Sequence, residues 1–234
     1  MKNIFYFVIC ALSAAAFSAC SDDDKLPTVT PSDRGTVTDN LGNTYGYVRI
    51  GNQLWTTSNA LNGTDMADLT YYNNFEYVDA FGSDEEKEYV WTEYQPAYGN
   101  LMTYADAVAS APDGWRLPSD ADWQKLERAL GMSNPDVKGF RGDGVAYKLR
   151  EDGSGTELAF KLGGACVWTV SFGLRELDLD FIDEFGYFWT STLDPSYDLE
   201  SAYFRKIFAG DGRVDRNCAT TDRLMSVRWV KDVE

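Results

Sequence analysis

Two helix-start patterns in the middle of the chain, with strand-like segments on both sides, constrain the fold more than any other feature. Thr103-x-x-Asp106 and Ser119-x-x-Asp122 both have the form of a capping box. Apolar residues recur at helical spacing after each of them, and Pro112 and Gly131 end the two periodic stretches. The sequence therefore predicts two short helices within a chain that is otherwise rich in β-type segments.

The segments around these helices have the alternation and the turn residues of strands. Tyr45 to Ile50 alternates between two turn clusters, whereas residues 59–98 show no sustained period and predict a long irregular connection. Five further strands are predicted after the helices, at Ala165–Phe172, Gly186–Ser191, Ala202–Phe208, Arg213–Cys218 and Met225–Val230. Strands, two helices and then a mainly antiparallel sheet make an α+β domain.

The N-terminus has the pattern of a bacterial lipoprotein signal. Lys2 precedes an uncharged apolar stretch, and Phe17-Ser-Ala-Cys20 places small residues directly before a cysteine. A signal peptidase needs small side chains there, and the thiol of Cys20 would carry the lipid. The apolar stretch is shorter than the roughly 20 residues that cross a bilayer as a helix. The alternative is an ordinary signal peptide in which the cysteine is incidental.

Residues 1–19 are thus predicted to be a signal peptide, 20–35 a lipidated tether and 36–234 one folded domain. The acidic run after Cys20, from Ser21 to Lys25, resembles the export signal of surface-displayed lipoproteins in Bacteroidota. The alternative is a solvated spacer. We expect the protein to lie at the outer membrane, facing the cell exterior, with the lipid as its only membrane contact.

Charge and composition exclude several function classes. The net charge is −16, which repels phosphate backbones and argues against nucleic-acid binding. The sequence contains no histidine, so the usual Ser-His-Asp and Cys-His catalysis and imidazole metal sites are ruled out. We therefore expect no catalytic residues and no cofactor.

Cys166 and Cys218 remain once Cys10 has left with the signal and Cys20 is lipidated. A disulfide between them is the only pairing possible within the domain, and an exported protein permits it. The alternative is two thiols that act as small apolar side chains.

Five ordered motifs identify a family resemblance. They are Tyr45 to Trp55, Tyr98 to Ala107, Pro112 to Ser119 with Trp123, Gly186 to Thr192, and Ser226 to Asp232. Together they resemble the Fibrobacter succinogenes major paralogous domain family, which is similar to the C-type-lectin-like fold and to the formylglycine-generating enzyme. The resemblance implies two helices packed on a twisted sheet, with Trp115 and Trp123 in the core, and it brings no established reaction.

Several family and fold features are missing. Ala111 and Trp229 stand where members often carry cysteines. Gln95-Pro-Ala97 lacks the carboxylate of the calcium motif in lectins, and no Trp-Asn-Asp is present. A cluster of four carboxylates has the oxygen ligands that a hard cation needs. The alternative, which we favour, is a solvated acidic edge, and we predict no metal. That cluster consists of Asp178, Asp180, Asp183 and Glu184.

The function that remains is that of a recognition or adhesion module for a glycan or a protein ligand, independent of calcium and non-catalytic. Aromatic faces stack on sugars and partners, and arginine and aspartate give directional hydrogen bonds. A structural subunit of a surface assembly, such as a fimbrial tip, is the alternative, and a carboxylate-based glycan-active enzyme is a third possibility. The predicted ligand-binding side chains are Tyr197, Tyr203, Arg205, Asp211, Arg213, Asp215, Arg216 and Asn217.

Overall fold

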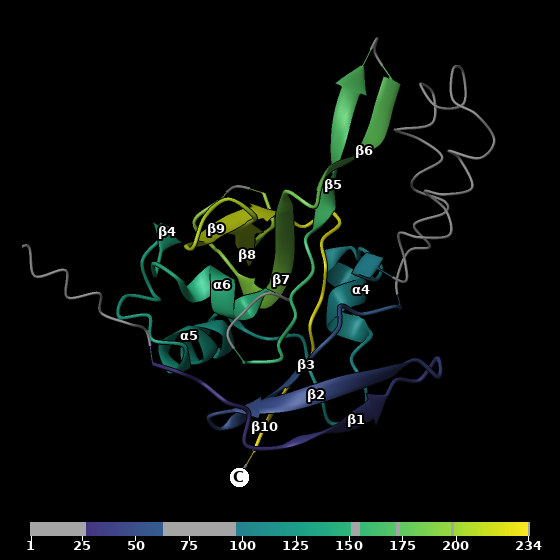
Figure 1. Cartoon of the computed structure of the whole chain (residues 1–234). Coiled ribbons are helices and arrows are strands. Elements are labelled where there is room, and N and C mark those ends of the chain that lie inside the picture. Colours follow the sequence, from purple (N-terminus) through teal and green to yellow (C-terminus); the bar gives the residue numbers. More distant parts are fainter. Residues whose placement is uncertain (1–26, 63–96, 151–154, 172–173, 198, 234) are drawn as a thin grey trace, which may run out of the picture.

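The computed structural model describes most of the chain from Pro27 onward (Figure 1). The described residues are 27–62, 97–150, 155–171, 174–197 and 199–233, without the side chains of 167–180. The predicted signal peptide, Cys20 and the start of the tether lie outside this part, as do residues 63–96 of the long connection. The side chains of Asp178 and Asp180, which belong to the acidic cluster, lie outside it as well.

A four-stranded antiparallel sheet joins the two ends of the domain. Its order is β1-β2-β3-β10, so the first and last described strands share one sheet. The tight β2–β3 turn is possible because Gly51 adopts a φ of 58°, where a side chain is disfavoured. The strands are β1 Arg34–Thr38, β2 Thr44–Ile50, β3 Gln53–Thr56 and β10 Val230–Asp232.

A six-stranded sheet forms the other half of the domain, in the order β4-β9-β8-β7-β5-β6. Its pairs are antiparallel except for β5 and β7, which meet in parallel at Gly164 and Gly186. The strands are β4 Gly139–Arg141, β5 Gly163–Ser171, β6 Leu174–Ile182, β7 Phe185–Leu193, β8 Ser201–Phe208 and β9 Val214–Thr220.

Three helices lie entirely within the described residues: α4 Tyr104–Ala109, α5 Asp120–Ala129 and α6 Val145–Leu149. The Ser119 side chain accepts from the Asp122 amide, and the Asp122 carboxylate accepts from the Ser119 amide, so the predicted capping box is confirmed. At the start of α4 the Thr103 side chain likewise accepts a hydrogen bond from the Asp106 amide. None of these helices has the length and apolar character needed to cross a membrane.

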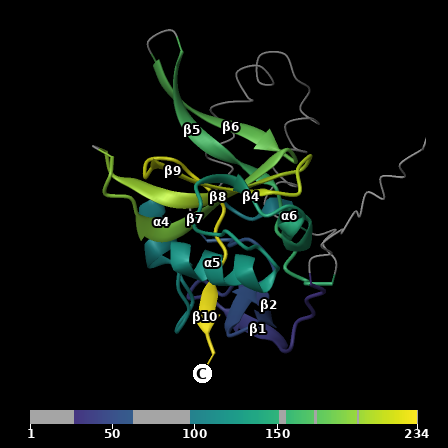
Figure 2. The ribbon, with the colours of Figure 1, turned by 90° about the vertical axis from the view of Figure 1, so that its left-hand side faces the viewer.

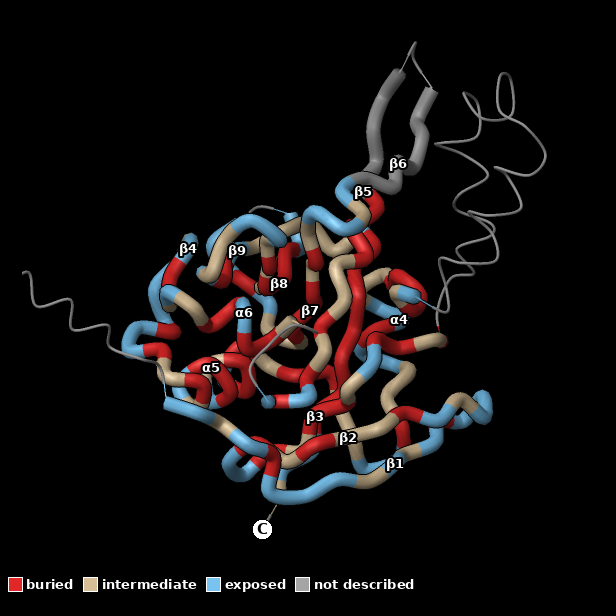
Figure 3. The backbone as a smooth tube through the Cα atoms, viewed as in Figure 1, coloured by how far each residue is buried: buried red, intermediate tan, exposed pale blue. Residues whose placement is uncertain are grey.

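The main core lies where α5 meets both sheets, and Figure 3 shows the buried residues gathered there. Trp123 of α5 has no exposed surface and packs its ring 5.2 Å from that of Trp55 in β3 and 5.3 Å from that of Phe160. The predicted core position of Trp123 is confirmed. Trp115 is partly buried beside the Tyr47 ring at 5.5 Å and packs against a second core cluster, so it lies at the edge of the core rather than within it.

The α+β class and the mainly antiparallel pairing are confirmed, with corrections to the element list. There are two sheets rather than one, and α6, β4 and β6 were not predicted. Residues 225–230 form single bridges and the start of β10 instead of the predicted strand, because their backbone pairs with several segments in turn. The strands predicted within residues 165–218 correspond to β5, β7, β8 and β9.

Candidate functional site

Three of the predicted ligand-binding side chains are part of the interior. Arg205 has no exposed surface, and Asp215 and Arg216 are 4% and 8% exposed. The assignment of Arg205 to a ligand surface is wrong, because a fully enclosed guanidinium cannot reach a ligand. Arg205 and Arg216 belong instead to a buried ion cluster between the six-stranded sheet and α5.

That buried ion cluster joins two carboxylates of α5 to three arginines of the sheet. Glu127 accepts from Arg141 Nη2 at 2.8 and 2.9 Å and from Arg205 Nε at 2.7 Å. Asp120 accepts from Arg216 Nε and Nη2, both at 2.8 Å. Burial alone would raise the pKa of Asp120, but hydrogen bonds and charge from Arg216 and Arg205 outweigh it and lower that pKa to about 2.

A second polar cluster lies where β7 ends, β8 begins and β9 ends. Asp194 accepts from Lys138 Nζ at 2.9 Å and from Cys218 Sγ at 3.0 Å. Hydrogen bonds from Ser196, Cys218 and Lys138 hold the pKa of Asp194 well below its ordinary value. The Lys138 ammonium also lies over the rings of Tyr197 and Tyr203, at 5.7 and 5.3 Å from their centres.

The predicted disulfide between Cys166 and Cys218 is not formed. Cys166 is buried in β5 and Cys218 lies in β9, and β7 and β8 stand between those strands. Three strand spacings amount to about 14 Å, whereas a disulfide needs Cα atoms within roughly 7 Å. Burial, followed by the hydrogen bond to Asp194, raises the pKa of the Cys218 thiol to about 12, so this thiol stays protonated.

The six-stranded sheet presents a second side, facing away from α5, that is rich in aromatic rings. Figure 2 shows α5 on one side of β7, β8 and β9, and the β5–β6 hairpin rising on the other. Arg205 faces α5, so Phe204, Lys206 and Phe208 must face away, because side chains alternate along a strand. We call this side the aromatic face; it comprises Phe140, Phe181, Phe185, Tyr187, Phe204, Lys206, Phe208 and Asp215.

Strand register places these side chains in cross-strand rows. One row runs from Tyr187 in β7 through Lys206 and Asp215 to Phe140 in β4. The row beside it pairs Phe185 with Phe208, whose rings stack at 4.8 Å. Phe181 extends the array with its ring edge-on to Phe185 at 5.3 Å. Ring-to-ring contacts therefore run across β6, β7 and β8, and Lys206 joins them to the Phe140 ring of β4.

The outer members of the aromatic face are open to solvent. Phe140 and Phe181 are 40% and 46% exposed, while Phe185, Tyr187 and Phe208 are half-buried. The other end of this side of the sheet is covered, because Tyr104 of α4 packs edge-on to the Trp189 ring at 5.7 Å. An aromatic surface of this kind is unusual on a soluble domain and marks interaction sites.

The cations on this face are already matched by carboxylates. Lys206 Nζ lies 5.0 Å from the Phe140 ring centre, 5.2 Å from that of Phe185, and 3.5 Å from an oxygen of Asp215. At the border of the face, Arg213 makes a two-pronged contact with Asp211, the shortest at 2.6 Å. Each of these two cations is thus paired with a carboxylate.

A strained turn connects the aromatic face with a neighbouring pocket. Phe181 and Asp183 adopt φ values of 71° and 62°, in the left-handed region that side chains with a Cβ disfavour. The turn is held because Asp183 N donates to Leu162 O at 2.8 Å and Ala209 N donates to Glu184 O at 2.8 Å. Strain of this kind persists at functional sites when the surroundings impose it.

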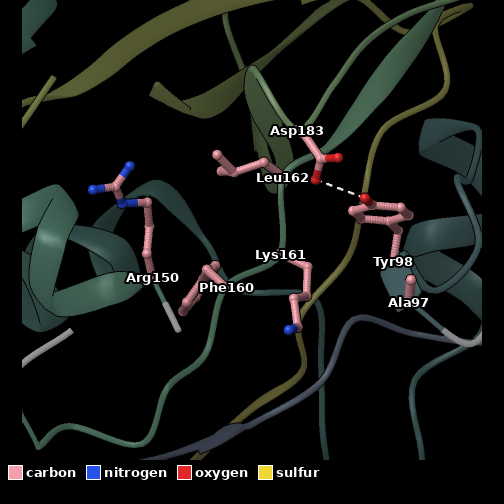
Figure 4. A pocket seen from close by; sticks show the side chains of 7 residues that line it. All are labelled: Ala97, Tyr98, Arg150, Phe160, Lys161, Leu162 and Asp183. Carbon is pink, nitrogen blue, oxygen red and sulfur yellow. Dashed lines mark hydrogen bonds between the residues drawn. The ribbon is translucent and has the colours of Figure 1, made fainter. Parts of the chain in front are cut away.

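The pocket encloses about 530 Å³ beside this turn (Figure 4). Tyr98 donates from its hydroxyl to Asp183 Oδ1 at 2.6 Å. Arg150 donates to Ala209 O at 2.5 Å and stacks on the Tyr147 ring at 4.9 Å, and Figure 4 shows its guanidinium pointing away from Lys161. The two cations do not converge on one point, so the pocket is not built around a single anionic group.

Metal ligation has no support within the part of the chain that is described. No group of three or more His, Cys, Asp or Glu side chains there is placed to hold an ion. Asp183, a member of the proposed acidic cluster, is engaged by Tyr98.

The structure places the predicted site residues in three different environments. Arg213 and Asp211 pair at the border of the aromatic face, and Asp215 lies within it. Tyr197, Tyr203 and Arg216 surround Lys138 and Asp194 at the other end of the strands, with Arg216 stacked 4.2 Å from the Tyr203 ring. Asn217 is exposed on β9, next to Phe204 in register.

Sequence reasoning missed most of the aromatic face, including Phe140, Phe181 and Lys206. A signal was present in the alternation of Phe204, Lys206 and Phe208 and of Phe185 and Tyr187. Alternation identifies one side of each strand, but only the strand order shows that these sides form one surface.

Comparison with known proteins places the chain in a family. No curated protein and no solved structure matches the chain. The family model for the Fibrobacter succinogenes major domain matches residues 48–231 of the chain. This range includes the entire aromatic face. Strand β1 and the start of β2 precede the matched range but pair within the same sheet. The resemblance seen in the five motifs is thereby confirmed, and the chain belongs to the Fibrobacter succinogenes major domain family.

Proposed function

We propose that this chain is a cell-surface recognition lipoprotein that holds a ligand against the aromatic face without calcium and without catalysis. The observation that carries the proposal is the array of rings across β6, β7 and β8, joined through Lys206 to Phe140 of β4, with Phe140 and Phe181 open to solvent. Rings that are fixed by a sheet contribute a large contact area at little conformational cost. The ion pairs of Lys206 and Arg213 fix the borders of this area.

The finer fold assignment and the location belong to the same proposal. We propose a C-type-lectin-like domain, supported by the family, the order of strands and capped helices, and the pairing of the first strands with the last. The signal pattern before Cys20 and the acidic run after it support a lipid anchor in the outer membrane, with the domain facing outward.

The lipid anchor has a direct test. Mass spectrometry of the membrane fraction should show an N-terminus at residue 20 that carries fatty-acyl chains on Cys20. The Cys20→Ser variant should leave the membrane fraction, because the lipid is then lost and the described helices offer no other span. Retention of residues 1–19, or an unmodified Cys20 at the membrane, would contradict the anchor.

The recognition role is tested by capturing the full chain, in detergent, on arrays of surface glycans and proteins. We expect capture to survive a chelator and to fall by about tenfold for Phe140→Ala, since one exposed ring contributes on the order of 1.4 kcal/mol. Leu41→Ala is the matched control, because Leu41 is 73% exposed at the distant β1–β2 turn. Equal losses for both variants, or loss with chelator alone, would refute the proposed mode of binding.

A structural subunit of a surface assembly is the second candidate, and one observation favours it. Leu193, Tyr197 and Leu199 are 46%, 51% and 69% exposed around the connection between β7 and β8. Exposed apolar side chains on one connection suit a protein partner. An assembly subunit should copurify with that partner, and Tyr197→Ala should release it.

A further inference from the structure

The charge balance of the aromatic face restricts the kind of ligand that it can hold. Lys206 is matched by Asp215 and Arg213 by Asp211, so neither cation is available for a negative group without breaking an existing pair. The whole chain carries a net charge of −16, which adds a repulsive field against anions. An acidic polymer is therefore disfavoured at this surface.

The shape of the face suits a chain of flat units. The row Tyr187, Lys206, Asp215, Phe140 crosses three strand spacings, which amounts to about 14 Å. Rings stand at both ends of this row, and Phe181 and Phe185 extend the Tyr187 end. Units with apolar C–H faces and hydroxyl edges would match this arrangement, in which rings stand on both sides of the polar pair Lys206 and Asp215.

The polar centre contains an acceptor that the described protein leaves unused. Asp215 is 4% exposed, its Oδ2 lies 3.5 Å from Lys206 Nζ, and its Oδ1 has no hydrogen-bond partner within the described residues. A buried acceptor without a donor is costly and calls for a specific explanation. Because this oxygen has almost no exposed surface, a ligand hydroxyl would supply the donor only after the neighbouring side chains move, whereas a ligand carboxylate would supply none.

We infer that the aromatic face binds a neutral glycan chain, which stacks on Phe140 at one end and on Phe181 at the other and donates a hydroxyl to Asp215. This inference rests on the proposed recognition function and names its ligand class. It adds no catalytic step.

The Phe181→Gly variant separates binding from folding. The φ of 71° at this position is unfavourable for phenylalanine and open to glycine, so removing the ring also removes backbone strain. We expect about a tenfold loss of neutral-glycan capture together with an unchanged or higher melting temperature. Leu41→Ala is the control, since it removes an exposed apolar side chain at the distant β1–β2 turn and should leave capture unchanged.

The probes are neutral polysaccharides, namely a soluble β-glucan, a mannan and a xylan, and acidic ones, namely polygalacturonate and heparin. The full chain should be retarded in gels containing at least one neutral polymer and should pass the acidic ones freely. Retardation should persist from about 0.05 to 0.5 M NaCl, because salt screens charge–charge attraction but not ring stacking.

The outcomes distinguish the ligand class from the recognition function. Retardation by acidic polymers alone, lost with Arg213→Gln and in high salt, would overturn the neutral-glycan inference but leave recognition standing. Capture of proteins but of no glycan, abolished by Phe181→Gly, would also overturn the neutral-glycan inference and leave the recognition function standing. Neutral-glycan binding that resists Phe181→Gly and Phe140→Ala would move the site elsewhere and overturn the inference. A folded chain that captures no glycan and no protein would overturn both.

Discussion

Replacing Glu127 with glutamine is expected to destabilise the protein by about 3–5 kcal/mol, the usual cost of removing one partner from a buried ion pair. Glu127 has no exposed surface and is the carboxylate shared by Arg141 and Arg205. A glutamine would leave both guanidinium groups buried and would turn an amide N–H₂ toward one of them. Urea unfolding monitored by tryptophan fluorescence should show a lower midpoint with an unchanged slope.

Glu157→Gln provides a matched control for this prediction. Glu157 also accepts two hydrogen bonds from one arginine, Arg34, at 2.7 and 2.5 Å, but both side chains are about half exposed. An exposed pair contributes about 0–1 kcal/mol, so this variant should stay close to the parent protein. Equal effects of the two changes would show that burial does not set the strength of the Glu127 contacts.

The buried ion cluster also explains why Arg205 on β8 was mistaken for part of a ligand surface and why Arg216 on β9 is mostly buried. Arg205 stands beside Lys206, and Arg216 stands between Asp215 and Asn217, so the local sequence is as polar as that of an exposed strand. Their partners, Asp120 and Glu127, lie on α5, 78 to 96 residues earlier in the chain. Contacts over such distances leave no mark in local spacing, and alternation alone cannot tell an outward arginine from an inward one that meets a carboxylate.

Local signals, by contrast, predicted local structure well. The capping box at Ser119 fixes the start of α5, because both of its hydrogen bonds lie within one helical turn. Strands β7 and β8 followed from their alternation and from the turns that bound them. Strand β6 was not predicted, because the carboxylates Asp178 and Asp180 within it were interpreted as a solvated acidic edge, although Leu177 to Phe181 alternates apolar with acidic residues.

The aromatic face could not be predicted from the sequence for a related reason. Phe140 belongs to β4, which is three residues long and too short to give a periodic signal. Its place beside Asp215 and Lys206 follows from the order β4-β9-β8, in which a strand that precedes β8 by some 60 residues pairs at the far side of β9. Sequence patterns indicated which side chains share one side of a strand, and only the topology showed which strands are neighbours.

Replacing Arg228 with alanine is expected to cost at least about 4 kcal/mol, from several buried acceptors that each lose a donor worth roughly 1–3 kcal/mol. Arg228 is 1% exposed and stacks 4.3 Å from the Phe160 ring. Its guanidinium donates to acceptors of two separate segments, and burial lowers its pKa. The acceptors are Asn59 Oδ1, Thr56 O and Leu158 O at 2.7 Å and Ala159 O at 2.5 Å.

Arg228→Lys should fail to restore this stability, and that failure is the informative result. A lysine keeps the charge but has one nitrogen, whereas the planar fork of arginine reaches acceptors on both segments at once. Ala159, one of those acceptors, sits at a φ of 47°, so the segment needs an outside contact to hold it. Arg116→Lys, at a 40%-exposed side chain paired with Asp122, should cost under about 1 kcal/mol. If Arg228→Lys unfolds at the same urea concentration as the parent protein, charge alone suffices at this position, and the fork does not join residues 56–59 to residues 158–159.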